Sequence, residues 1–96
     1  MSEPESGGAA LNIKIGDEEL KGRYANLVRI THTREEFFLD FINLVPPQGI
    51  VTARIVASPQ HLKRIVQALA TNLARYEEAF GKVPEVPDPY AGGRTN

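Results

Sequence analysis

The chain has 96 residues, of which 42% are hydrophobic and 24% charged, so an ordinary folded domain is expected rather than a disordered segment. Its core should be thin, because a chain of this length buries only about 60 to 65% of the surface exposed on unfolding. The absence of cysteine excludes disulfides, thiolate metal sites and cysteine nucleophiles, and the net charge of −1 argues against a strongly basic nucleic-acid-binding protein.

The two ends of the chain differ in composition from its body. Residues 1–10 and 83–96 are rich in Pro, Gly, Ser and acids, and they are predicted to be flexible tails around a single domain at 11–82. The first ten residues have no base and no apolar stretch, so they do not resemble a secretory signal. Because no apolar run approaches the roughly 18 to 20 residues needed to span a bilayer, we expect a cytoplasmic protein without a membrane partner.

Four strands joined by short links are predicted in the first half of the domain, at 11–15, 22–32, 35–45 and 50–57. LNIKI at 11–15 alternates apolar and polar residues and ends at a Gly-Asp turn. The turn before the last strand contains Pro46-Pro47 and Gly49, a glycine that could adopt a positive φ there. Short links favour antiparallel neighbours, so a four-stranded meander is expected.

The strand predicted at 35–45, EEFFLDFINLV, is apolar on both faces. Phe37, Leu39 and Phe41 lie on one face, and Phe38, Asp40, Ile42 and Leu44 lie on the other. A small sheet normally keeps one face wet, so the second apolar face needs a cover of its own. We therefore predict that the chain's own helix covers one face and a second copy of the chain covers the other.

A single long helix is predicted from Pro59 to the residue before Gly81. Ser58 is a favourable N-cap, proline is tolerated at the first helical position, and glycine is a common stop. A helix of about 22 residues is about 33 Å long. Its apolar residues follow a spacing of four, three, four, three and four, which defines a heptad seam formed by Leu62, Val66, Leu69, Leu73, Tyr76 and Phe80.

The predicted fold is therefore α+β, an antiparallel four-stranded meander followed by one long C-terminal helix packed on the sheet, in a homodimer. The predicted core and interface consist of Phe38 and Ile42 on the sheet and the six residues of the heptad seam. If two helices cross antiparallel near Ala70, Lys63 of one chain lies near Glu77 of the other.

Asp40 is the one charged residue among the aromatic and aliphatic residues of its strand. A buried carboxylate needs a hydrogen-bond donor or a raised pKa, and Arg29 and Arg54 on the neighbouring predicted strands are the candidate donors. We interpret Asp40 as part of a structural ion pair, because no second carboxylate lies at a spacing suited to acid–base catalysis.

The ordered motifs YAN, EFFLDF, ARIVASPQHLKRIVQAL and NLARYEEAFG resemble a small prokaryotic family, domain-of-unknown-function family 3467. Its members share the pattern EFxLDF, a proline-containing turn, RIVxSPxHxKR and NxxxYExxFG. The resemblance covers roughly residues 11–83 and implies a compact prokaryotic domain. It implies no activity, cofactor or catalytic residue, because none is established for the family.

Patterns typical of enzymes are weak in this sequence. Ser58 and His61 have the residue types of a nucleophile and a base, but helix capping explains the serine and no nearby acid would orient the histidine. His32, His61 and Asp40 lack the local spacing of a metal site, and no glycine-rich phosphate-binding loop is present. We therefore expect a protein that is not an enzyme and has no cofactor, no metal and no catalytic residue.

Two functions remain as hypotheses. The first is a homodimeric protein-interaction or adaptor module, whose protein partner the sequence does not identify. The alternative is a nucleic-acid-binding regulatory protein, in which helix amides and basic side chains at the start of the helix contact phosphate. The residues predicted to make this contact are Arg34, Arg54, His61, Lys63 and Arg64.

Overall fold

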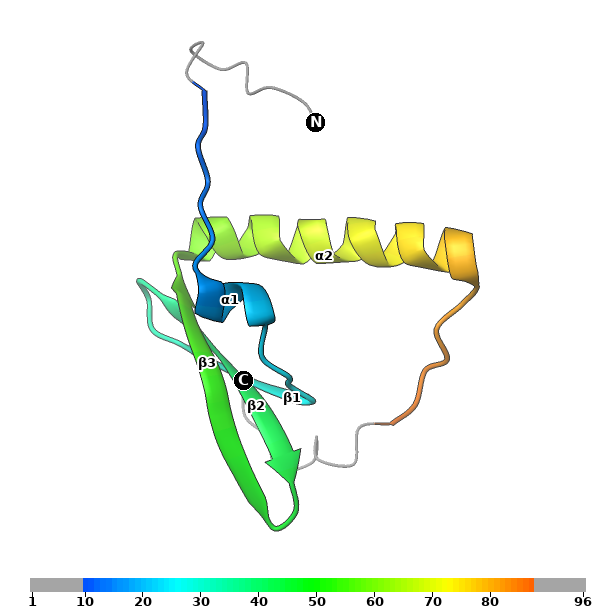
Figure 1. The fold of residues 1–96 in the computed structure, drawn as a ribbon, viewed down its shortest axis with the longest axis horizontal. Coiled ribbons are helices and arrows are strands. Elements are labelled where there is room, and N and C mark those ends of the chain that lie inside the picture. Colours follow the sequence, from blue (N-terminus) through cyan, green and yellow to red (C-terminus); the bar gives the residue numbers. More distant parts are fainter. Residues whose placement is uncertain (1–9, 88–96) are drawn as a thin grey trace.

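The computed structural model describes residues 10–87, which form one small antiparallel sheet, one short helix and one long helix (Figure 1). The elements in chain order are α1 (Asp17–Lys21), β1 (Leu27–His32), β2 (Phe37–Val45), β3 (Gln48–Ala57) and α2 (Pro59–Phe80). Most of the predicted tails, residues 1–9 of 1–10 and residues 88–96 of 83–96, lie outside the described residues. Within 10–87, the prediction of an α+β chain with an antiparallel sheet and a C-terminal helix is confirmed.

The sheet has three strands in the order β1-β2-β3, and β2 is its central strand. Both pairings are antiparallel, as the short connections favour. Their register places Arg29 of β1, Asp40 of β2 and Arg54 of β3 directly opposite one another. The register shifts after Phe41, where β3 carries the extra residue Thr52, whose hydroxyl donates to the Phe41 carbonyl at 3.1 Å.

The prediction of a strand at 11–15, and with it a fourth strand, is wrong for the single chain. Residues 11–16 form neither helix nor strand. Alternation of apolar and polar residues makes a segment suitable for a sheet, but a strand also requires an adjacent edge with which to pair. The next residues, DEELK, form α1, because three acids occupy its first turn and Lys21 pairs with Glu18 at 3.2 Å.

The turn between β2 and β3 is tighter than predicted. Pro46-Pro47 alone form it, with a cis peptide bond, and Gln48 already belongs to β3. Gly49 lies inside the strand and does not have a positive φ. A Cβ atom at this position would lie 3.1 Å from Leu44 Cδ1 and 3.2 Å from Ile42 Cγ2, so close side-chain packing explains the glycine.

The boundaries of α2 are those predicted from the sequence. The Ser58 hydroxyl accepts a hydrogen bond from the backbone N–H of His61 at 3.1 Å, and Pro59 occupies the first turn. Gly81 ends the helix with a φ of 97°, a conformation that favours glycine. Among residues 10–87, no helix combines the length and hydropathy required to cross a bilayer.

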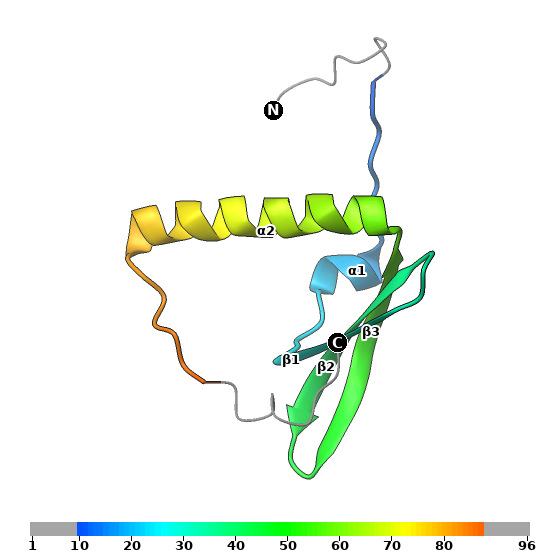
Figure 2. The same cartoon turned by 180° about the vertical axis from the view of Figure 1, so that it is seen from behind.

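The prediction that α2 packs along the sheet is wrong for the single chain. Figures 1 and 2 show that α2 begins at the end of β3 and extends away from the strands. None of the 22 residues of α2 is buried. The buried apolar residues of 10–87 are Leu39, Ile42 and Ala57, all in strands. Helical periodicity predicts which face of α2 is apolar, but it does not fix what that face contacts.

Candidate functional site

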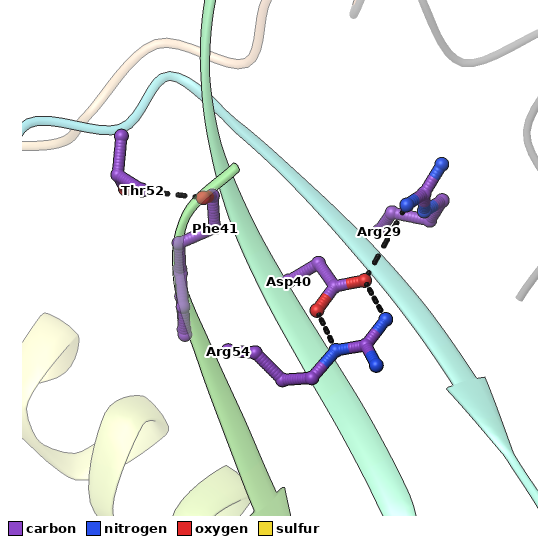
Figure 3. Close-up of polar contacts among 5 residues, drawn as sticks. All are labelled: Arg29, Asp40, Phe41, Thr52 and Arg54. Atoms are coloured by element: carbon purple, nitrogen blue, oxygen red, sulfur yellow. Dashed lines mark hydrogen bonds and ion pairs between the residues drawn. The ribbon is translucent and has the colours of Figure 1, made fainter. Parts of the chain in front are cut away.

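Asp40 lies at the centre of a polar group on the sheet, formed with Arg29 and Arg54 and here named the Asp40 cluster (Figure 3). Arg54 binds the carboxylate with two hydrogen bonds, from Nε to Oδ1 at 2.6 Å and from Nη2 to Oδ2 at 2.8 Å. Arg29 donates from Nη2 to Oδ2 at 3.4 Å. The structure therefore joins the three residues that the sequence suggested as an ion pair, because the register sets them side by side.

The electrostatics of the cluster follow from this geometry. Asp40 is 1% exposed, whereas the two arginine side chains are about half exposed. The hydrogen bond from Arg54 lowers the pKa of Asp40 from 3.8 to about 2, and it outweighs the desolvation that raises this pKa. The same contact raises the pKa of Arg54. A carboxylate with a pKa this low stays ionised at neutral pH, which suits an ion pair and not a proton donor.

Phe38 extends the Asp40 cluster along the same face of the sheet. The guanidinium carbon of Arg54 lies 5.4 Å from the centre of the Phe38 ring, within the range of a cation–π contact. Phe38 is half-buried, while Val51 and Val56 on the same face are exposed. Ile42, predicted as an interface residue, is already buried within the chain. This face therefore presents partly exposed apolar side chains around a carboxylate whose hydrogen bonds are already made.

The heptad seam of α2, here named the apolar stripe, is mostly exposed in the single chain. Its first residue, Leu62, is half-buried near the start of the helix. The remaining five are exposed, at 57% for Val66, 65% for Leu69, 52% for Leu73, 51% for Tyr76 and 76% for Phe80. Tyr76 and Phe80 also contact each other, with ring centroids 5.0 Å apart. So many exposed large side chains in one row are typical of a surface that another molecule covers.

The basic residues suggested for nucleic-acid contact are divided by the structure. Phe37 pairs with Ala57, so the β1–β2 turn and the start of α2 lie at the same end of the sheet. Arg34 in that turn and His61, Lys63 and Arg64 on α2 are exposed there. The Arg54 guanidinium instead donates two hydrogen bonds to Asp40, so these two N–H groups are not free to contact a phosphate. The turn also carries Glu35 and Glu36, which reduce its positive charge.

The residues considered for catalysis or metal binding have structural contacts. The Ser58 hydroxyl serves as the N-cap of α2, and His32 packs against Phe37 with ring centroids 4.9 Å apart. Within the described part of the chain, no group of three His, Cys, Asp or Glu side chains is placed to hold a metal ion.

The sequence pattern of a family described as Protein of unknown function (DUF3467) matches residues 1–85. The chain belongs to this family. The match confirms the resemblance drawn from the EFFLDF, SPQH and YEEAFG motifs. No curated protein and no solved structure is similar enough to this DUF3467 protein to count as a match.

Asn26, the last residue of the YAN motif in this DUF3467 protein, has a role that the sequence analysis missed. Its side-chain oxygen accepts from the Leu44 N–H at 2.8 Å, and its side-chain nitrogen donates to the Leu44 carbonyl at 3.0 Å. The amide side chain thus continues the ladder between β1 and β2 by one step. The available signal was an asparagine inside the strand predicted at 22–32, because its side chain mimics a peptide group.

Proposed function

We propose that this DUF3467 protein is a non-enzymatic homodimer that acts as a protein-interaction or adaptor module. The observation that carries the proposal is the exposure of the apolar stripe on α2. Burying such side chains stabilises a protein by roughly 1.5 to 3 kcal/mol each, so a chain that exposes five of them gains most by covering them with a partner.

A second copy of the chain is the occupant that fits the apolar stripe. A spacing of three and four residues lets two equal helices pack along their seams. Lys63 and Glu77 stand seven residues on either side of Ala70, so an antiparallel crossing at Ala70 brings each lysine near the partner's glutamate. The Glu77 carboxylate also accepts from the Val83 N–H at 3.0 Å, which orders it at the end of the helix.

An adaptor role follows from what such a dimer leaves exposed. The partly open face around the Asp40 cluster presents Phe38, Val51 and Val56 beside two arginines. Aromatic and arginine side chains with a desolvated centre are enriched in protein-binding surfaces. A two-fold dimer would present this face twice.

Light scattering of the full chain at micromolar concentration tests the dimer. We expect twice the mass of one chain, and a single-chain mass for Leu69→Glu, which places a charge in the apolar stripe. Thr71→Glu adds the same charge on the polar side of α2 and should leave the mass doubled. A single-chain mass for the wild type contradicts the proposal.

Affinity capture from a native lysate tests the adaptor role. A protein retained by the wild type and by Gln60→Glu on the polar side of α2, but lost with Val56→Glu on the sheet, supports it. Capture that does not change with Val56→Glu, in a variant that stays dimeric, contradicts the assignment of this face.

A nucleic-acid-binding regulatory function is the second candidate, favoured by the placement of Arg34 beside the start of α2. The first turn of α2 contains His61 and no acid, and Lys63 and Arg64 follow in the second turn, near the end of the helix whose amides attract phosphate. Binding to mixed DNA and RNA that weakens steeply with salt, and that is lost in Lys63→Ala/Arg64→Ala, would support this function. Absence of binding at low salt would contradict it.

A further inference from the structure

We propose that residues 11–15 pair with the outer edge of β3 in a second copy of the chain and complete its sheet as a fourth strand. This inference rests on the proposed homodimer and adds a second, reciprocal connection between the two copies. The donated strand comes from LNIKI, and the acceptor is the backbone of β3.

The donor segment has the chemistry of a strand without a partner. Leu11, Ile13 and Ile15 share one face and are 72%, 86% and 61% exposed, while Asn12 and Lys14 share the other. One apolar and one polar face are typical of a strand that lies at the edge of a sheet and is covered on one side. Five extended residues span about 17 Å, enough to pair with roughly half of β3.

The outer edge of β3 has the chemistry of an acceptor. Among residues 10–87, no strand lies beyond β3, so one side of this ten-residue strand has no partner backbone. Exposed edges are normally protected by proline, lysine or other charges. β3 contains neither proline nor lysine, and the guanidinium of its one charged residue, Arg54, is bound to Asp40. Its apolar residues Ile50, Val51, Ile55 and Val56 are exposed.

The outer edge of β1 is a poorer acceptor. β1 has six residues against ten in β3, and its apolar residues Leu27, Val28 and Ile30 are already half-buried. Arg29 and His32 add charge or potential charge to this short edge. Pairing at β3 would therefore cover more exposed apolar surface than pairing at β1.

The direction of the donor segment favours pairing between chains. α1 lies against the sheet, since a shallow groove is lined by Glu19 and Gly22 together with Ala53 and Ile55 of β3. In both Figure 1 and Figure 2, residues 10–16 run nearly straight from α1 away from the sheet and past α2. To reach its own β3 the segment would have to reverse at Gly16, whereas β3 of another copy can receive it without that reversal. Addition of a strand to an open edge is a common mode of association.

The test uses full-length chains in dimers made by refolding equal amounts of isotope-labelled and unlabelled protein. Isotope-filtered NMR then detects only contacts between chains. We expect nuclear Overhauser effects from the methyl groups of Leu11, Ile13 and Ile15 to α-protons of β3 in the other chain. Amides of 11–15, which have no backbone partner among residues 10–87, should exchange with solvent at least about tenfold more slowly than unpaired amides.

A matched pair of variants gives the control. Ile13→Asp should abolish the interchain contacts of this segment and its amide protection, whereas Lys14→Asp on the opposite face should retain both. Ile13 contacts little within its own chain, so neither variant should prevent folding. A dimeric mass without interchain contacts from 11–15, or contacts seen only within one chain, overturns the inference and leaves the homodimer intact. A single-chain mass overturns the homodimer itself.

Discussion

The Asp40 cluster and the apolar stripe differ in what they require from outside the chain. Asp40 is almost completely covered, and two arginines supply its hydrogen bonds from within the same sheet. The five residues of the stripe from Val66 to Phe80 are at least half exposed, and nothing among residues 10–87 covers them. The hydrogen bonds of the buried carboxylate are therefore made within the chain, whereas the apolar stripe stays exposed in the single chain and would be buried only in the homodimer that we propose.

Breaking the association should affect the two regions unequally, and this is the largest effect we expect. A helix that packs against little is marginal in water, so Leu69→Glu should accelerate amide exchange along α2 at least about tenfold. Amides of β2 should change much less, because the β1 and β3 ladders protect them. Hydrogen exchange measured by mass spectrometry checks this, with Thr71→Glu as the control. Equal loss of protection in both regions would show that the sheet depends on the helix as strongly as α2 depends on a partner.

Removing the anion of the Asp40 cluster should have the next largest effect. Asp40→Asn leaves two arginines without a counter-ion, and we expect the midpoint of thermal unfolding to fall by several degrees. Glu36→Gln neutralises an exposed acid and serves as the control.

The two arginines of the cluster should not contribute equally. Arg54→Lys should destabilise more than Arg29→Lys, because Arg54 makes two shorter bonds and lysine cannot reproduce its fork. Thermal unfolding of the two variants checks this order, and the reverse order would assign the main partner of Asp40 to β1.

The stability that Asp40 provides should depend on pH in a defined range. The folded-state pKa is about 2 and the ordinary value is 3.8, so the folded state favours the ionised form. The contribution is complete above about pH 4 and is lost as the pH falls toward 2. The difference in thermal midpoint between wild type and Asp40→Asn should therefore shrink over this interval. A difference that stays constant from pH 5 to pH 2 would contradict the ion pair.

Reversing charges near the ends of the apolar stripe should have the smallest effect. Lys63→Glu should weaken the dimer a few-fold, because exposed ion pairs contribute only about 0.2 to 1 kcal/mol each and a two-fold axis repeats the pair. Adding Glu77→Lys should restore much of the loss, whereas adding Glu78→Lys should not. Sedimentation equilibrium measures the dissociation constants. Equal constants for both double variants would argue against an antiparallel crossing at Ala70.

The features that could be predicted from the sequence depend on neighbours along the chain or across a short turn. Ser58 and Pro59 at one end of α2, and Gly81 at the other, each act on the adjacent helical turn. Both ends of α2 were therefore predicted correctly. Asp40 and its arginines follow from hairpin connections, which bring adjacent strands together.

The features that were missed depend on surfaces distant in the chain or on competing local signals. The pattern of 11–15 indicates a strand but does not specify its partner edge, and periodicity does not specify what α2 packs against. α1 was missed although Asp17, Glu18 and Glu19 favour a helix start. Gly16 before this segment was instead assigned to a turn, and Gly22 after it was assigned to the next strand.

The junction between β3 and α2 consists of Ser58 alone, since β3 ends at Ala57 and α2 begins at Pro59. A link of one residue fixes the rotational phase of the helix relative to the strands. Each residue of an α-helix turns the side-chain direction by about 100°, so one alanine inserted after Ser58 would swing the apolar stripe by more than a quarter turn while keeping every side chain in it. In the homodimer that we propose, the length of the chain at this one position would thus set the orientation of the two sheets.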